Sequence, residues 1–168
     1  MNQLINTTLV YLVRNGSCLM LHRIKKQNDI NRDKWIGVGG KFENAESPED
    51  CLRREVWEET GLTLNSWTYH GIVTFVSVTD TVFTEYMHLF SSDDFTGTPK
   101  LCEEGVLEWV PMDRIPELNL WEGDLIFLRL MRDGSPFFSL KLVYHGNELT
   151  EAVLNGTALN RKEYGQWN

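Results

Sequence analysis

The sequence predicts one α+β domain, in which a mixed β-sheet carries helices on both faces. Pairs of short segments rich in β-branched and aromatic residues are separated by turn residues, which is typical of hairpins. Two further segments have apolar residues at helical spacing and end in glycine. With 168 residues, of which 42% are hydrophobic, the chain is long enough for one core. We place this domain at residues 1–155 and expect a polar tail at 156–168.

The first half of the chain begins with two predicted strands in segment 7–23, joined by Asn15-Gly16. This dipeptide is strongly favoured in tight hairpin turns. A polar loop over 24–34 leads to a glycine-rich strand at 35–42. The spacing of Gly37, Gly39 and Gly40 predicts a bulge or the close approach of another backbone segment.

The best-marked helix is predicted between Ser47 and Gly61. Ser47 is a good N-cap, Pro48 suits the first helical position, and Gly61 is a typical stop. Leu52 and Val56 lie one turn apart and form an apolar edge that should dock on the sheet. The glutamates beside this edge should therefore lie at a partly buried rim.

The second half of the chain repeats the same alternation. Segment 71–92 predicts a hairpin that turns near Asp80-Thr81, 93–105 a loop, and 106–112 a short strand. A second helix is expected over 121–134. Segment 136–154 predicts a last hairpin that turns at Gly146-Asn147. The tail from Gly156 should be loosely packed.

The net charge and the cysteine number exclude several kinds of partner and site. The net charge of −8 argues against a nucleic-acid polymer or an acidic membrane as partner. A small anionic substrate would need local cations, which carboxylates can supply by holding metal ions. Three scattered cysteines indicate neither a disulfide framework nor a zinc site. Residues 1–13 lack the features of a signal peptide, so we expect a cytoplasmic protein.

The stretch REVWEETGL, residues 54–62, concentrates acidic charge on one side of the predicted helix. Glu58 and Glu59 follow Glu55 at helical spacings of three and four, where like charges repel by about 0.2–0.5 kcal/mol per pair. Either this is a solvated acidic face, or a divalent cation offsets the repulsion.

A wider pattern favours the cation. Gly40, Glu46 and the segment from Arg54 to Leu62 match GX5EX7REUXEEXGU, with U aliphatic, at every specified position. The segment thus resembles the Nudix box, and the strand order around it is similar to the family's α/β/α sandwich with a mixed sheet. The family hydrolyses phosphoanhydrides of nucleoside diphosphate derivatives with Mg²⁺, and Mn²⁺ is an alternative ion.

The resemblance implies a role for each box residue. Glu55, Glu58 and Glu59 would be metal ligands, and Glu58 or Glu59 would act on the attacking water. Arg54 would orient a box glutamate through an ion pair, and Glu46 would have a supporting role. Gly40 would let the loop pass close to the metals, with Gly39 and Lys41 beside the substrate. Trp57 should point away from the acidic side.

Outside the box the chain is most similar to the MutT/MutX branch, which hydrolyses oxidised purine triphosphates such as 8-oxo-dGTP. The similarity lies in KWIGVGGKFE and CEEGVLEWVPMDRIPELNLWEGD. It implies a further metal ligand and three substrate contacts: Glu104 for metal, Arg23 for phosphate, Trp121 for base stacking and Asp124 for the base edge. As alternatives, Trp121 is a core residue, Asp124 an early helical acid, Glu104 a loop acid and Arg23 a surface residue.

One departure affects the base. Some oxidised-purine enzymes of this branch carry Asn where this chain has Ile36, which offers no side-chain hydrogen bond. The leading hypothesis is hydrolysis of a nucleoside triphosphate to monophosphate and pyrophosphate, acting on oxidised purine nucleotides. The alternatives are another nucleotide substrate, such as ADP-ribose or a dinucleoside polyphosphate, and a non-catalytic nucleotide sensor.

Overall fold

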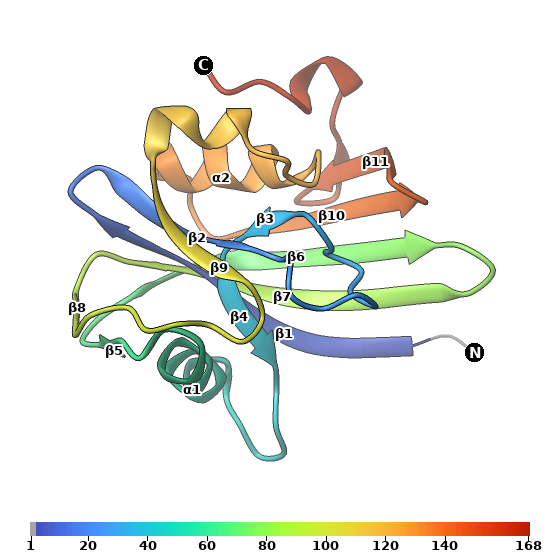
Figure 1. Cartoon of the computed structure of the whole chain (residues 1–168). Coiled ribbons are helices and arrows are strands. Elements are labelled where there is room, and N and C mark those ends of the chain that lie inside the picture. The colour runs from blue at the N-terminus through green and yellow to red at the C-terminus, as the bar shows by residue number, and fades with distance from the viewer. Residues whose placement is uncertain (1–2) are drawn as a thin grey trace. The chain divides into compact units, whose positions relative to one another are not determined.

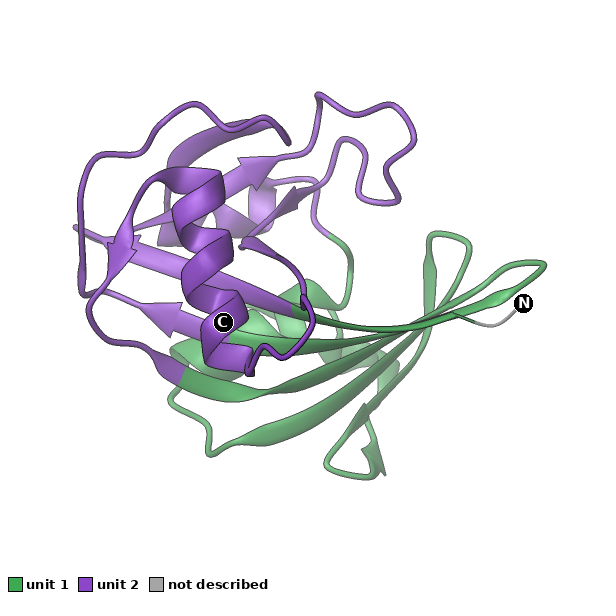
Figure 2. Cartoon of the chain, turned by 90° about the horizontal axis from the view of Figure 1, so that it is seen from below, with its two compact units in different colours: residues 1–7, 69–89, 121–168 green, residues 8–68, 90–120 purple. Residues whose placement is uncertain are grey.

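A computed structural model of the chain describes residues 3–168, and residues 1 and 2, where the predicted domain begins, lie outside it. The chain divides into two compact units, which Figure 2 colours separately. Unit 1 comprises residues 1–7, 69–89 and 121–168, and unit 2 comprises 8–68 and 90–120. Strands β1 (Gln3–Arg14), β6 (Thr68–Val78) and β7 (Val82–Ser92) have residues in both.

Unit 2 is built on the predicted first hairpin. β1 pairs antiparallel with β2 (Ser17–His22), and Arg14 lies opposite Ser17. The turn residues Asn15 and Gly16 both have positive φ, 53° and 74°, as the Asn-Gly dipeptide predicts. β2 also pairs antiparallel with β9 (Val106–Pro111) and with β3 (Trp35–Ile36). β2 is therefore hydrogen-bonded along most of its length.

The predicted glycine-rich strand is interrupted. It forms β3 and then β4 (Val38–Lys41), which pairs with β1, and Gly37 lies between them. A Cβ atom on Gly37 would lie 2.6 Å from the Val10 carbonyl oxygen, and one on Gly39 only 1.9 Å from that of Thr8. The predicted close backbone approach is thus confirmed, and it requires glycine at both positions.

Helix α1 (Pro48–Thr60) has the predicted ends. The Ser47 hydroxyl accepts a hydrogen bond from the Asp50 N–H, and the Asp50 carboxylate accepts one from the Ser47 N–H, which completes a capping box. Gly61 ends the helix with a φ of 75°. Leu52 and Val56 are fully buried. α1 packs against β4 and the short β5 (Thr63–Leu64), as Figure 1 shows.

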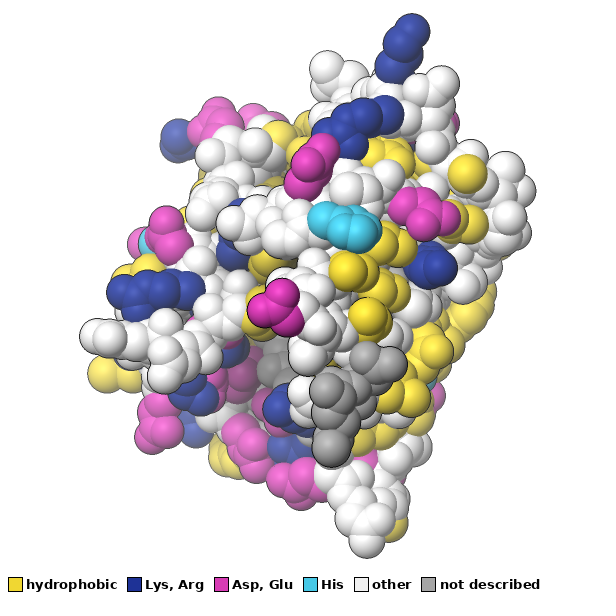
Figure 3. Space-filling model, turned by 90° about the vertical axis from the view of Figure 1, so that its right-hand side faces the viewer, with side chains coloured by type: hydrophobic (Ala, Val, Ile, Leu, Met, Phe, Trp, Pro, Cys, Tyr) yellow, Lys and Arg dark blue, Asp and Glu magenta, His cyan; other side chains and the backbone are white. Residues whose placement is uncertain are grey.

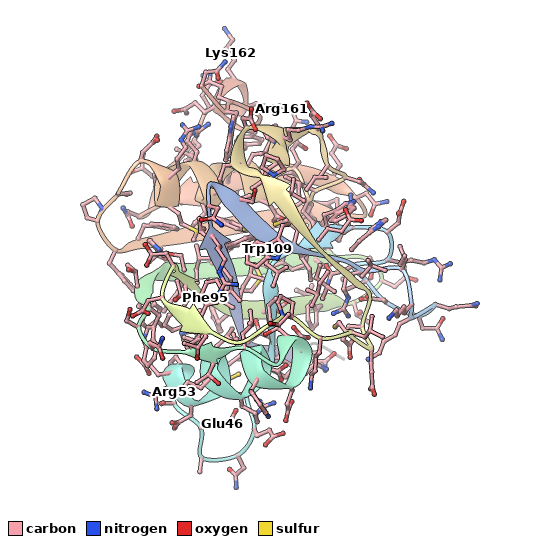
Figure 4. All side chains as sticks on the ribbon, turned by 60° about the vertical axis from the view of Figure 1, so that its left-hand side comes forward. Glu46, Arg53, Phe95, Trp109, Arg161 and Lys162 are labelled. Atoms are coloured by element: carbon pink, nitrogen blue, oxygen red, sulfur yellow. The ribbon has the colours of Figure 1, made fainter. Side chains whose placement is uncertain are left out.

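The segment expected to be a loop at 93–105 contains a strand that the sequence did not predict. β8 (Phe95–Thr96) pairs antiparallel with β5 in a second, two-stranded sheet. Phe95 lies beside Trp109 of β9, with stacked rings whose centroids are 6.3 Å apart (Figure 4). The Arg14 guanidinium lies 4.4 Å from the Phe95 ring centre. β9 runs directly into the 3-10 helix η1 (Met112–Glu117).

Unit 1 contains a mixed sheet. β10 (Phe138–His145) pairs in parallel with β6 (Thr68–Val78), so that Leu140 lies opposite Val73. On its other side β10 pairs antiparallel with β11 (Glu148–Leu154), which pairs with β12 (Thr157–Ala158). The predicted turn at Gly146 is present, with a φ of 62°. β6 and β7 are neighbouring strands, as the second predicted hairpin requires.

The second helix is shorter than predicted. α2 (Asp124–Arg132) begins three residues after Trp121, because residues 121–123 form a turn in which the Asp124 N–H donates to the Trp121 carbonyl. Gly123 takes the N-cap position. The predicted stop at Gly134 is present, with a φ of 69°.

The tail is more firmly attached than the sequence suggested. It forms β12 and the 3-10 helix η2 (Arg161–Glu163), which carries Arg161 and Lys162 in Figure 4. Tyr164 is buried, and its hydroxyl accepts a hydrogen bond from the Ala152 N–H at 3.1 Å. Arg129 of α2 donates to the carbonyls of Glu163 and Gln166. Most of the tail is nevertheless exposed, and these contacts attach it through residues that are distant in sequence.

Charged side chains lie on the surface (Figure 3), whereas the cysteines are buried. On the face that Figure 3 shows, acidic side chains are interspersed with lysines and arginines rather than forming a field of one sign. Cys18, Cys51 and Cys102 are free and buried. Among residues 3–168, no helix has the length and apolar character needed to cross a membrane.

Candidate active site

The predicted partly buried rim holds for Glu55 and Glu59 of α1 but not for Glu58. The Glu59 side chain is buried at 8% exposure, Glu55 is largely covered at 14%, and Glu58 is open to solvent at 54%. Leu52 and Val56 carry the buried side of the same helix. Because the apolar edge is buried, the adjacent Glu59 side chain is buried as well, whereas the Glu58 side chain stays in contact with water.

Arg54 holds this acidic cluster together. Its guanidinium donates to Glu46 at 2.5 Å and 3.0 Å, to Glu55 at 2.7 Å and to Glu58 at 3.2 Å. It also donates to the Lys41 carbonyl at 2.9 Å. The predicted ion pair between the box arginine and a box glutamate is thus present. Arg54 therefore offsets part of the repulsion among Glu46, Glu55 and Glu58.

Glu46 is the best-compensated acid of the cluster. It lies in the loop just before α1 and is labelled in Figure 4. The hydrogen bond from Arg54 is the main reason why the pKa of Glu46 is lowered to about 2. Glu46 also accepts a hydrogen bond from the Glu43 N–H at 2.7 Å. These contacts fit the predicted supporting role, because they join the loop to the helix.

Glu59 is the opposite case. Burial raises its pKa to about 8, although it accepts a hydrogen bond from the Gly39 N–H at 3.1 Å. The neighbouring charge of Glu55 adds to the rise. The pKa of Glu55 is also raised by burial, against the effect of Arg54. Two covered carboxyl groups with raised pKa values form a site in which a bound cation would be stabilising.

Gly40 lies directly against Glu55. A Cβ atom at position 40 would lie 2.4 Å from Glu55 Cδ and 2.5 Å and 2.7 Å from its two carboxylate oxygens. Only a residue without a side chain leaves room for this carboxylate. The neighbouring Lys41 side chain is exposed, and its backbone carbonyl accepts the hydrogen bond from Arg54.

Arg23 and Glu104 form a second charged group in unit 2. Arg23 donates to Asp29 at 2.7 Å and lies 3.2 Å from Glu104, which also pairs with Lys26 at 2.7 Å. Burial alone would lower the pKa of Arg23, but the hydrogen bond and charge of Asp29 raise it overall. Arg23, the expected phosphate contact, is thus paired with Glu104, the expected extra metal ligand. Asp29 was missed because the sequence placed it in an undifferentiated polar loop.

The expected base-contacting residues lie in unit 1. Trp121 is 6% exposed, and its ring packs edge-on against Phe75 and Tyr144, with centroids 5.5 Å and 5.0 Å away. Asp124, also 6% exposed, is the first residue of α2. Tyr144 was missed, because one tyrosine in an apolar strand carries no functional signal in sequence.

Among residues 3–168, no three His, Cys, Asp or Glu side chains surround one ion position as they stand. Glu58 and Glu104 instead face Arg54 and Lys26. The donor chemistry nevertheless fits Mg²⁺, which prefers carboxylate oxygens.

Comparison with known proteins gives consistent results. Residues 4–131 match the family model of the NUDIX domain. The oxidized purine nucleoside triphosphate hydrolase of Danio rerio is 32% identical over 124 residues, 74% of this chain and 77% of that protein. The protein of the same name from Mus musculus is 32% identical over 112 residues, 67% of this chain and 71% of that protein.

Solved structures agree with these sequence relatives. The Mutator MutT protein of Bacillus halodurans has a TM-score of 0.77 and is 25% identical, covering 90% of this chain and 97% of that one. The MutT protein of Methanosarcina mazei has a TM-score of 0.64 at 25% identity, covering 79% of this chain and 96% of that one. The predicted fold class, α+β with a mixed sheet, is confirmed.

Proposed function

Since the chain belongs to the Nudix hydrolase family and is therefore an enzyme, we propose that it hydrolyses oxidised purine nucleoside triphosphates, such as 8-oxo-dGTP, to monophosphate and pyrophosphate. The observation that carries the proposal is the presence of all four box carboxylates: Glu55, Glu58 and Glu59 lie on α1, and Arg54 pairs with Glu55, Glu58 and the loop residue Glu46. The two vertebrate relatives, named for oxidised purine substrates, support the choice of substrate.

Mg²⁺ is the proposed cofactor, with Mn²⁺ as a substitute. Glu55, Glu58, Glu59 and Glu104 would supply carboxylate oxygens, and Gly40 leaves the space that Glu55 occupies. The ion supplies positive charge that neutralises phosphate oxygens and acidifies bound water. For Glu58 and Glu104 to become ligands, they must exchange their contacts with Arg54 and Lys26.

The chain's own residues would position the phosphates and the water. Glu59 is buried and fixed by the Gly39 N–H, which suits a ligand, whereas the exposed Glu58 can reach the attacking water. Arg23 would contact phosphate, with Asp29 holding its guanidinium in place. Lys41 and the Gly39 backbone are proposed as further phosphate contacts.

Base recognition is assigned to unit 1. Trp121 would stack on the purine, and Asp124 would accept or share hydrogen bonds along its edge. Because Ile36 offers only backbone groups, the side-chain contribution to base choice falls on Asp124. Within the cell we propose the reducing cytoplasm, which suits the three free cysteines.

A panel of nucleotides tests this proposal. Purified enzyme with Mg²⁺ should release pyrophosphate from 8-oxo-dGTP at a higher kcat/KM than from dGTP, dATP or pyrimidine triphosphates, and chelator should abolish turnover. Glu58→Gln and Glu59→Gln each keep the size of the side chain and remove its charge, and at least one should lower kcat by orders of magnitude. A preference for ADP-ribose or a dinucleoside polyphosphate would reject the substrate, and full activity in chelator would reject the metal site.

A further inference from the structure

Tyr144 contacts two residues of the segment Trp121–Asp124. It belongs to β10, is fully buried, and its hydroxyl accepts a hydrogen bond from the Gly123 N–H at 2.8 Å. Gly123 is the N-cap of α2 and directly precedes Asp124. The hydroxyl thus fixes the backbone at the point where the helix begins.

The ring of Tyr144 holds the same segment at its other end. Its centroid lies 5.0 Å from that of Trp121, at an interplanar angle of 69°, and 5.0 Å from that of Phe75. Phe75 in turn lies 5.5 Å from Trp121. One side chain therefore contacts the segment Trp121–Asp124 at two residues, through its ring at Trp121 and its oxygen at Gly123.

The fit at Gly123 leaves no spare room. A Cβ atom there would lie 2.6 Å from Leu142 Cδ1 and 2.8 Å from the Tyr144 oxygen. The turn is pressed against β10, so its position depends on the side chains of that strand.

The Tyr144 hydroxyl also has a proton to donate. A phenol has one donor and two lone pairs, and the Gly123 N–H occupies a lone pair. Burial, and then the nearby charge of Asp124, raises the pKa of Tyr144. Asp124 exerts the strongest charge effect on it, ahead of Glu122.

We propose that Tyr144 is a positioning residue for base selectivity: its hydroxyl holds the turn at Gly123 and thereby sets where Asp124 meets the edge of the purine. The inference rests on the proposed role of Trp121 and Asp124 in base binding. Tyr144 acts through the turn and does not itself touch the reacting phosphates.

The test removes a single oxygen atom. Tyr144→Phe keeps the ring against Trp121 and Phe75 but leaves the buried Gly123 N–H without its acceptor. Tyr164→Phe is a matched control, because that buried hydroxyl also accepts one backbone N–H, from Ala152, but lies in the tail. Both variants lose one hydrogen bond of the same type, so a general loss of stability should affect them alike.

Steady-state kinetics with 8-oxo-dGTP and dGTP should separate the two variants. Tyr144→Phe should raise KM for the preferred nucleotide about five- to tenfold, change kcat less than about twofold, and lower the ratio of the two kcat/KM values. Tyr164→Phe should leave that ratio at the wild-type value. In an Asp124→Asn background, Tyr144→Phe should change the ratio no further, since its effect passes through Asp124.

The preference of the wild-type enzyme across nucleotides tests the proposed substrate independently of Tyr144. The comparison of variants tests the role of Tyr144, and it uses the two nucleotides whose kcat/KM values differ most in the wild type. Equal selectivity of Tyr144→Phe and Tyr164→Phe, or additive effects with Asp124→Asn, would overturn the inference. A Tyr144→Phe protein that unfolds under assay conditions, while Tyr164→Phe stays folded, would assign the hydroxyl to stability and overturn it as well.

Discussion

Gly40→Ala should disable catalysis while leaving the fold intact. The added methyl carbon would lie 2.4 Å from Glu55 Cδ, where carbon atoms normally approach to about 3.5–4.0 Å. The Glu55 carboxylate must therefore move by about 1 Å or more. It is the far end of a flexible side chain, and Gly40 does not use positive φ, so the displacement should cost little stability.

A shift of about 1 Å in a group that positions the reaction typically costs about a hundredfold in rate. We therefore expect kcat to fall about a hundredfold in Gly40→Ala, and half-maximal activity to require more Mg²⁺. The measurements are turnover against Mg²⁺ concentration and the thermal unfolding midpoint. Gly165→Ala is the control, because a Cβ there meets nothing within 4 Å. Should Glu55→Gln be inactive while Gly40→Ala keeps wild-type kcat and Mg²⁺ dependence, the inferred contact would be refuted.

Three further outcomes are expected. Leu52→Ala should lower the free energy of unfolding by about 2–5 kcal/mol in urea titrations, because this side chain is fully buried. Trp57→Ala, on the exposed side of α1, should cost much less, and equal losses would contradict the packing of α1 against β4 and β5 through Leu52. In chelator, stability should fall as the pH rises from 4.5 towards 8, because native Glu59 keeps a proton that the unfolded chain has lost. Glu59→Gln should reduce that slope in thermal melts and leave the part that the raised pKa of Glu55 contributes, and an unchanged slope would refute the assignment. Trp121→Ala should raise KM about tenfold, because base stacking is worth about 1–3 kcal/mol. Asp124→Asn should change the ratio of 8-oxo-dGTP turnover to dGTP turnover. Wild-type kinetics in both variants would mean that the base binds elsewhere.

Local signals explain what the sequence predicted well. The limits of α1 depend on Ser47, Pro48 and Gly61, which act within one turn of the helix, and all three behave as expected. The turn at Asn15-Gly16 is equally local. The box acids were found because the fixed spacing of a helix is enough to bring their side chains together.

What the sequence did not predict depends on distant contacts. β8 forms in a segment expected to be a loop because it pairs with the distant strand β5. Asp29 gains its role from the position of Arg23, and Tyr144 from a turn more than twenty residues earlier in the chain. No local pattern marks such pairs. Propensity and periodicity describe neighbours along the chain, whereas these functions arise from neighbours in space.

The contacts of Arg54 bear on how the enzyme is made in the cell. Many metalloproteins collect their acidic ligands only when the ion arrives, so that folding itself waits for the metal. Here a guanidinium built into the chain gathers Glu46, Glu55 and Glu58 beforehand. We therefore expect a newly synthesised chain to reach its native state in a metal-poor environment. The proposed Mg²⁺ would then govern how fast the enzyme works, and not how much folded enzyme is present.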